Sequence, residues 1–208
     1  MSYCQIIRQD DSLDLAILEA NLNALGMDTN HSEFLLVVSN ESDLERLKSK
    51  FANELNNGLL KVAIPESVKN ERLLNLAVGL ASGAVIMTLG AKDQLAPRMT
   101  TFIWKELLTE NERLLIFEKK RKLPKRIAMF RNTLIEVGGF DEGIKPQLQI
   151  QNIIGRLSQI GVSLQPKSHD NLTRTLEKRK STFSFFKPKP TVMLDYKKVE
   201  MEEYRWLA

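Results

Sequence analysis

The chain has 208 residues, of which 43% are hydrophobic and 27% are charged, and its formal net charge is +4. This length is enough for one substantial hydrophobic core, so we expect one domain with an appendage. The single cysteine, Cys4, excludes an internal disulfide and a cysteine-based metal site, and no basic-then-apolar signal segment opens the sequence. These features predict a cytoplasmic location.

Strand and helix patterns alternate along the first part of the chain. Short apolar, strand-like runs lie at 3–8, 34–38, 59–64 and 84–89, and segments with helical spacing of apolar residues lie between them, at 13–25, 44–55 and 66–80. Polar residues at 10–12 and 42–43 are predicted to cap the first two helices. Such β-α-β units favour an α/β fold with an open, mostly parallel sheet flanked by helices, in which ligands bind at the carboxyl ends of the strands.

Residues 73–91 form a run of nineteen uncharged residues. A membrane span needs about 20 predominantly apolar residues, so this run is a candidate for one. However, Asn75, Gly79, Ser82 and Gly83 interrupt it, and helical spacing before Gly83 changes to a β-branched, strand-like pattern after it. We therefore interpret the run as a helix, a tight turn and a buried strand that leads into a loop.

Two segments carry a recognisable succession of motifs. The first, 75–97, reads NLAVGLASGAVIMTLGAKDQLAP, and the second, 128–142, reads AMFRNTLIEVGGFDE. In content, order and separation they resemble family 2 glycosyltransferases of the GT-A fold. The resemblance covers residues 3–165. It implies a GT-A-like domain at 1–166 that transfers a sugar from a nucleotide-sugar donor to a glycan, lipid-linked or protein acceptor.

The resemblance also implies a divalent cation, Mn²⁺ or Mg²⁺, held by an Asp-x-Asp pair against the donor diphosphate. The two aspartate positions fall on Gly90 and Lys92, and only the following Asp93 is a carboxylate. One carboxylate beside a lysine disfavours a divalent ion. Lys92 then either places a fixed positive charge against the diphosphate, with Arg126 and Arg131 adding to it, or is a solvated residue paired with Asp93.

The position of the general base is altered as well. An inverting transfer needs a carboxylate that accepts the proton of the acceptor hydroxyl. The resemblance implies a Glu-Asp-x-Asp phrase at 149–152, but these residues read Gln-Ile-Gln-Asn. Asp141 and Glu142 are therefore the candidate catalytic residues. The change of both motifs keeps open a second interpretation, a non-catalytic homologue that binds carbohydrate or a partner protein.

The remaining candidate donor contacts follow the first two strands. The resemblance implies paired aspartates after the second strand, where Ser39 and Asn40 stand instead, and these side chains can hydrogen-bond a base. Asp10, after the first strand, either contacts the nucleotide or begins a helix. Asn75, in the helix of the first motif, completes the predicted donor-binding set.

Positive charge is concentrated in two segments. Residues 118–131 carry seven basic side chains against one acidic, and 174–189 carry six against one, so the rest of the chain has a balance of 4 − 11 = −7. An anionic partner or a solvated helix face explains such runs. In the arm at 167–208, phenylalanines alternate with lysines, which predicts peripheral contact with the inner face of a membrane or an arm folded over the domain; nucleic acid is the less favoured partner. A terminal helix is predicted at 197–207.

Overall fold

The computed structural model describes residues 1–8, 11–26, 32–38, 40–65, 69–109, 113–118, 126–168 and 204–207. Its strands are β1 (Ser2–Ile7), β2 (Glu33–Val38), β3 (Leu60–Pro65), β4 (Val85–Leu89), β5 (Arg113–Glu118), β6 (Arg126–Phe130), β7 (Ser163–Ser168) and β8 (Tyr204–Leu207). Its helices are α1 (Leu15–Gly26), α2 (Glu41–Lys50), α3 (Ala52–Asn56), the 3-10 helix η1 (Asn70–Arg72), α4 (Leu73–Leu80), α5 (Met99–Leu108), α6 (Arg131–Glu136) and α7 (Pro146–Gln159).

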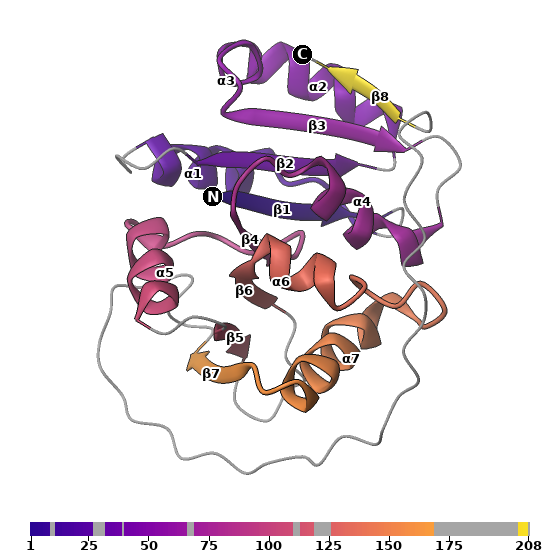
Figure 1. The fold of residues 1–208 in the computed structure, drawn as a ribbon. Helices are drawn as coiled ribbons and strands as arrows, with labels where there is room; N and C mark the ends of the chain where they lie inside the picture. Colours follow the sequence, from indigo (N-terminus) through magenta and orange to yellow (C-terminus); the bar gives the residue numbers. More distant parts are fainter. Residues whose placement is uncertain are drawn as a thin grey trace.

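The described strands form one eight-stranded sheet in the order β7-β5-β6-β4-β1-β2-β3-β8 (Figure 1). Strands β1 to β4 are parallel to one another where they pair, and β5 pairs in parallel with β7. Strand β6 runs antiparallel to both β4 and β5, and β8 runs antiparallel to β3. The predicted open, mostly parallel sheet is confirmed.

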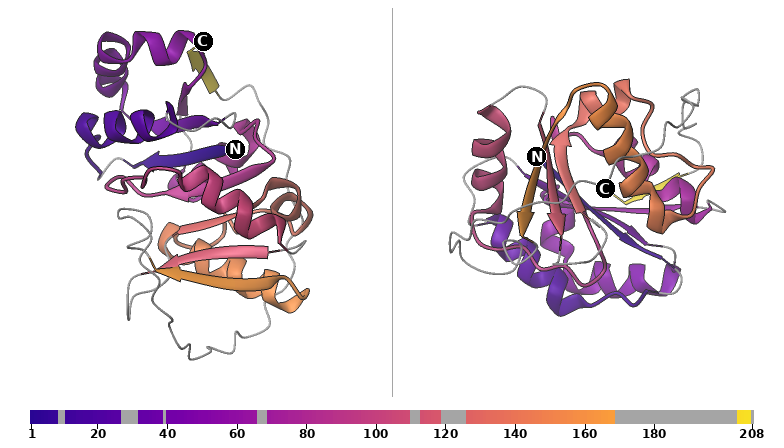
Figure 2. Two further views of the ribbon diagram at one scale, coloured as in Figure 1. Left: turned by 90° about the vertical axis from the view of Figure 1, so that its left-hand side faces the viewer. Right: turned by 90° about the horizontal axis from the view of Figure 1, so that it is seen from below.

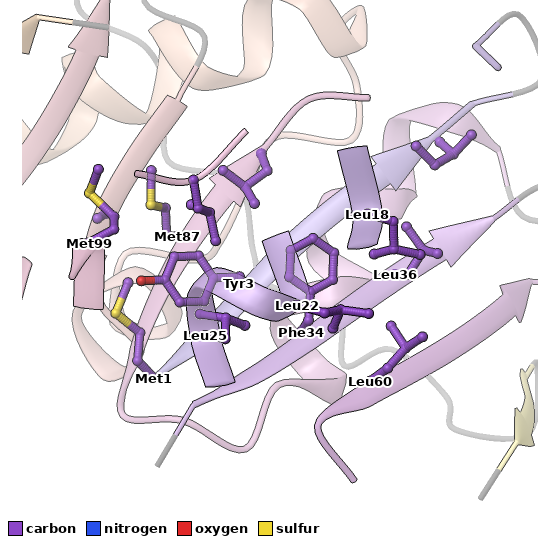
Figure 3. Close-up of a cluster of buried hydrophobic side chains, with 14 of the residues drawn as sticks. Met1, Tyr3, Leu18, Leu22, Leu25, Phe34, Leu36, Leu60, Met87 and Met99 are labelled. Carbon is purple, nitrogen blue, oxygen red and sulfur yellow. The ribbon is translucent and has the colours of Figure 1, made fainter. Parts of the chain in front are cut away.

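Helices cover both faces of the sheet. One buried cluster joins side chains of α1, α2 and α5 to one face, and a second cluster joins α4, α6 and α7 to the other. Figure 2 shows α1 and α2 on the side of the sheet opposite α7. Figure 3 shows part of the first cluster, with Leu18, Leu22 and Leu25 of α1 over the strands. Because the central strands are buried on both faces, they are almost entirely apolar, which is what made them recognisable in the sequence.

The first two helices begin at caps other than the predicted ones. Asp14 accepts hydrogen bonds from two backbone N–H groups of the first turn of α1, at 2.9 and 3.2 Å. Asn40 caps α2, because its side-chain oxygen accepts from the backbone N–H of Ser42 at 3.0 Å. The caps predicted at 10–12 and 42–43 are therefore wrong, since in each case another side chain reaches the unpaired N–H groups.

Two apolar segments resolve into shorter elements. The helix predicted at 44–55 is divided into α2 and α3 at the buried Phe51, whose φ and ψ of −121° and 34° are not helical. The uncharged run at 73–91 forms α4 and β4, joined by a short turn, as predicted. Within the described part of the chain, no helix is long and apolar enough to cross a membrane.

The end of the chain adds a strand to the sheet. Residues 204–207 form β8 beside β3 (Figure 1), so the helix predicted at 197–207 is wrong over these four residues. The edge of β3 offers unpaired backbone groups, and a segment rich in large aromatic residues satisfies them as a strand. The phenylalanine-rich part of the arm lies outside the described residues.

A buried carboxylate ties together the amino ends of β1, β2 and β4. Glu33 accepts hydrogen bonds from the hydroxyl of Ser2, from the backbone N–H and hydroxyl of Ser82, both at 2.6 Å, and from Lys61 Nζ at 2.6 Å. A Cβ at Gly83 would lie 2.6 Å from Ser2 Oγ, so only glycine allows this close approach. Burial alone would raise the pKa of Glu33, but these hydrogen bonds outweigh it and lower the pKa to about 2.

This network predicts an acid-sensitive contribution to stability. The pKa of Glu33 falls from 4.5 to about 2 on folding, so its contribution is complete above pH 4.5 and is lost as the pH falls toward 2. We expect Glu33→Gln to lower the free energy of unfolding at pH 7 by about 3 kcal/mol. It should also flatten the loss of stability between about pH 5 and 3 in urea titrations. Glu136→Gln, at an exposed position, controls for the removed charge. An unchanged acid profile in Glu33→Gln would contradict the assignment.

Candidate functional site

The candidate site lies where the carboxyl ends of β1 and β4 meet. These strands are parallel neighbours with Gln5 opposite Leu89. Gln5 Nε2 donates a hydrogen bond to the carbonyl oxygen of Gly90 at 2.9 Å, which holds the loop after β4 against β1. Arg8 follows the last residue of β1 directly. Both loops therefore lie at the edge where open parallel sheets bind ligands.

The loop after β4 is a turn organised by one buried carboxylate. Asp93 donates its backbone N–H to Gly90 O at 3.0 Å, and Asp93 Oδ2 accepts from the backbone N–H of Gly90 at 2.7 Å. The same oxygen forms an ion pair with Arg126 Nε. Asn21 of α1 fixes the far side of the turn by donating to Asp93 O at 3.0 Å and accepting from Leu95 N at 2.7 Å. The turn is thus fastened to a helix and to a neighbouring strand.

Gly90 leaves room for the guanidinium of Arg126. A Cβ at Gly90 would overlap Arg126 Nη2 and would lie 2.5 Å from Arg126 Cζ. Arg126 begins β6, which runs antiparallel to β4, so the two residues meet across the pair of strands. A cationic side chain consequently lies over the position at which the resemblance implies the first metal-binding aspartate.

The residues of this turn do not fit a divalent cation. Asp93 is paired with Arg126 and not with Lys92, which is exposed. In the ranges that the structure describes, no group of three or more His, Cys, Asp or Glu side chains could hold a metal ion. A positive guanidinium beside the one carboxylate of the turn repels a second cation. We therefore assign no step to a metal.

Arg8 brings a second guanidinium to the same corner. Its Nε atom is buried and has no hydrogen-bond partner among the described residues. Its loop closes through Asp11, whose backbone N–H donates to Arg8 O at 2.9 Å. Burial lowers the pKa of Arg8 below its ordinary value; the carboxylate of Asp11 opposes this shift, the charge of Arg126 adds to it, and Glu71 opposes it. Arg8 follows β1, and Arg126 lies over Gly90 at the end of β4, the strand beside β1, so the two guanidinium groups belong to one corner of the sheet.

Asn75 joins the opposite wall of the site to α4. Asn75 Nδ2 donates to the carbonyl oxygen of Phe140 at 2.7 Å and to Glu142 Oε1 at 2.8 Å, while Asn75 Oδ1 accepts from the backbone N–H of Phe140 at 2.7 Å. Glu142 also pairs with Arg72 at 3.3 Å and keeps 31% of its side chain exposed. Asn75 therefore positions the predicted catalytic segment, and its amide is occupied by that role.

The two glycines before Phe140 have backbone conformations that other residues rarely adopt. Gly138 and Gly139 have φ values of 84° and 67°. Arg156 of α7 donates to the carbonyl oxygen of Val137 at 2.7 Å and to that of Gly139. Arg156 therefore closes the loop that presents Asp141 and Glu142.

Gln149 occupies the first position of the implied base phrase. It is fully buried, and its Nε2 donates to the carbonyl oxygens of Glu71 at 2.6 Å and Asp141 at 2.8 Å. Its Oε1 is buried without a hydrogen-bond partner in the described part of the chain. Asp141 itself uses Oδ1 to accept from the backbone N–H of Gly143 at 2.8 Å. Both candidate carboxylates are partly exposed, and Glu142 is the one that does not close its own loop.

Two predicted donor contacts, Arg131 and Asn40, make their contacts elsewhere in the fold. Arg131 donates to the carbonyl oxygens of Val78 at 2.9 Å and Gly79 at 3.3 Å, at the end of α4 and thus at the amino end of β4, away from Gly90. Asn40 caps α2. Asp10 and Ser39 lie outside the described residues.

The sequence interpretation missed two members of the cluster, Arg8 and Gln149. The loop after the first strand was expected to matter, and a charged residue directly at the carboxyl end of that strand was the available signal for Arg8. Gln149 was identified as the first residue of the implied base phrase, but only the fold places its amide against the carbonyl oxygens of Glu71 and Asp141.

The sequence matches no protein-family model and no curated protein. Solved structures that share the fold include the following three proteins. The mannosyltransferase PcManGT from Pyrobaculum calidifontis, in complex with GDP-Man and Mn²⁺, is 14% identical with a TM-score of 0.60, over 80% of this chain and 54% of its own. S. aureus TarS 1-349, in complex with UDP-GlcNAc, is 14% identical with a TM-score of 0.58, over 87% and 59%. The 4-diphosphocytidyl-2C-methyl-D-erythritol synthase from Anaerococcus prevotii is 11% identical with a TM-score of 0.55, over 80% and 87%.

These likenesses show that the chain has the GT-A glycosyltransferase fold that the resemblance implied. Membership of family 2 in particular stays a prediction. This chain spans 54% of the mannosyltransferase and 59% of the TarS structure. Identities of 11% to 14% concern the fold alone, and the synthase among the matches bears a different activity in its name. The fold is therefore compatible with more than one reaction, and the residues of the site determine which one occurs.

The position of Asn75 yields a stability prediction. Asn75→Asp would remove the donor to Phe140 O and would place a second carboxylate against Glu142. We expect a loss of about 2 kcal/mol or more in the free energy of unfolding, measured by urea denaturation. Asn132→Asp, an exposed substitution on α6, is the matched control. Equal stability of the two variants would show that the amide does not hold the segment.

Proposed function

We propose that this protein binds a nucleoside-diphosphate sugar at the carboxyl ends of β1 and β4 and transfers the sugar to an acceptor hydroxyl. The observation that carries the proposal is that basic and acidic side chains gather at the carboxyl-end edge of the sheet. Arg126 and Arg8 supply positive charge on one wall, and Glu142 presents a carboxylate on the other. Glu71, in η1 directly before α4, joins the second wall, because its carbonyl oxygen accepts from Gln149 Nε2. Two of the matched structures hold GDP-Man or UDP-GlcNAc.

In the proposed reaction, Glu142 accepts the proton of the acceptor hydroxyl as the hydroxyl oxygen forms a bond to the anomeric carbon of the donor sugar. The bond between that carbon and the phosphate oxygen breaks, and its electron pair leaves with the nucleoside diphosphate. Positive charge on the opposite wall stabilises the departing diphosphate. Asn75 and Arg72 hold Glu142 in place for this step. A glycan or lipid-linked acceptor, and a membrane contact through the C-terminal arm, remain part of the proposal.

A second candidate function is non-catalytic binding of a nucleotide sugar, a glycan or a partner protein at the same edge. It is favoured by Gln149, whose amide takes the first position of the implied base phrase and is committed to two backbone carbonyl groups. An amide does not accept a proton at neutral pH. In this alternative the edge keeps its binding role, and Glu142 acts only by pairing with Arg72.

Nucleotide binding can be tested by thermal unfolding with uridine, guanosine, thymidine and cytidine diphosphates, each with and without Mn²⁺. A ligand at 100 times its Kd stabilises the folded state by about 2.7 kcal/mol, which raises the Tm of a domain of this size by roughly 5 °C. We expect such a rise for at least one of the four nucleotides. The corresponding nucleosides, which lack the phosphates, are the control. No shift with any diphosphate would contradict the proposed donor site.

The role of Glu142 predicts a split between binding and turnover. Glu142→Gln retains an oxygen for Asn75 Nδ2 but does not accept a proton, so transfer should fall by about 100-fold or more. Turnover can be followed as release of nucleoside diphosphate from the matching sugar nucleotide, with water or added glycans as acceptor. The Tm rise caused by the nucleotide should persist. Glu136→Gln is the matched control, and an unchanged rate in Glu142→Gln would exclude it as the base.

A further inference from the structure

We propose that Arg8 and Arg126 form a metal-independent clamp for the donor diphosphate. This inference rests on the proposed nucleotide-sugar site and deepens it by naming the groups that neutralise the diphosphate. Two guanidinium groups supply positive charge where a divalent cation would otherwise bind, and Asp93 balances the charge of one of them. The clamp therefore replaces the ion that the fold family implies and that the residues around Gly90 do not fit.

Arg126 is the fixed half of the clamp. Its Nε pairs with Asp93, whose side chain is only 7% exposed, so the guanidinium cannot leave without stranding a buried carboxylate. Gly90 keeps the space over the end of β4 open for it, because any side chain there would overlap Arg126. Asp93 itself is held by the backbone N–H of Gly90 at 2.7 Å. The positive charge is thus preorganised before a ligand arrives.

Arg8 is the half with an unmet hydrogen-bonding capacity. Its Nε is buried with no hydrogen-bond partner among the described residues, an arrangement that costs free energy in a folded protein. Burial and the nearby charge of Arg126 both disfavour the cationic form and lower the pKa of Arg8, although Asp11 and Glu71 partly offset this. An anion between the two arginines would satisfy the orphan N–H and relieve the repulsion.

A diphosphate fits this arrangement better than other anions do. Guanidinium groups present pairs of N–H donors in a plane, and phosphate oxygens accept them bidentately. Two guanidinium groups, one directly after β1 and one over the end of β4, suit two linked phosphates more closely than one carboxylate. A divalent cation is disfavoured at the same place because both arginines repel it.

Arg126 also replaces Lys92 as the residue that stands in for the metal. Lys92 lies at the exposed surface of the turn, whereas Arg126 is anchored by Asp93 in the corner itself. A flexible lysine loses side-chain entropy when it binds, whereas an anchored guanidinium has already lost it. The sequence pattern indicated Lys92, which is adjacent to Asp93, but the fold brings Arg126, 33 residues away in the sequence, to the site.

The clamp can be tested by calorimetric titration of the full chain with the nucleoside diphosphate that raises its Tm, first in EDTA and then with Mn²⁺. We expect the same Kd in both buffers and a Kd at least about tenfold higher for the matching monophosphate. Arg8→Met should weaken diphosphate binding by about tenfold or more and change the Tm of the free protein little, because Met keeps the apolar part of the side chain and the lost Nε has no hydrogen-bond partner among the described residues. Lys105→Met, an exposed substitution on α5, controls for the removed charge.

Arg126 needs a paired design, because Arg126→Met alone would strand Asp93. The double variant Arg126→Met with Asp93→Asn removes both charges, and it is compared with Asp93→Asn alone; we expect about tenfold weaker binding in the double variant. Loss of binding in Lys92→Met with normal binding in the Arg8 and Arg126 variants would overturn the clamp. Binding that requires Mn²⁺ would overturn it too, while leaving the donor site intact. No binding in either buffer would instead remove the proposed function itself.

Discussion

The ion pair between Asp93 and Arg126 is the interaction on which the site depends. It joins the turn after β4 to the start of β6, two segments that lie 33 residues apart in the sequence. The same carboxylate closes the turn through Gly90, and Asn21 ties the turn to α1. Because Gly90 has no side chain, the guanidinium comes to lie at the carboxyl end of the central strands. One pairing therefore fixes both the shape and the sign of charge of this corner.

The amino ends of the strands contribute to stability, and the carboxyl ends hold the candidate site. At the amino ends, Glu33 has partners for both carboxylate oxygens, and the network serves to hold three strands together. At the carboxyl ends, two buried polar atoms, Arg8 Nε and Gln149 Oε1, have no partner among the described residues. Buried polar groups are normally satisfied, so unmet capacity gathered at one edge is more consistent with ligand binding than with folding.

The sequence sufficed for the features that depend on local periodicity and on motif order. Runs such as the one at 34–38 had to be buried strands, and the uncharged run at 73–91 had to fold as a helix and a strand. Side-chain pairings could not be predicted in the same way. Whether Asp93 would pair with the adjacent Lys92 or with Arg126 depends on the antiparallel placement of β6, which is a tertiary feature. For the same reason the sequence could not show that Arg131, expected beside Lys92 and Arg126, lies at the amino end of β4.

The central claim is that a cationic corner, and not a metal ion, receives the diphosphate of the donor. A crystal structure of the protein with a bound nucleoside diphosphate, grown in the presence of EDTA, tests this claim most directly. The account predicts phosphate oxygens within hydrogen-bonding distance of Arg8 Nε and of the Arg126 guanidinium, with the pair between Arg126 and Asp93 intact. A diphosphate bound elsewhere, or one that appears only when Mn²⁺ is coordinated by Asp93 with Arg126 displaced, would contradict it.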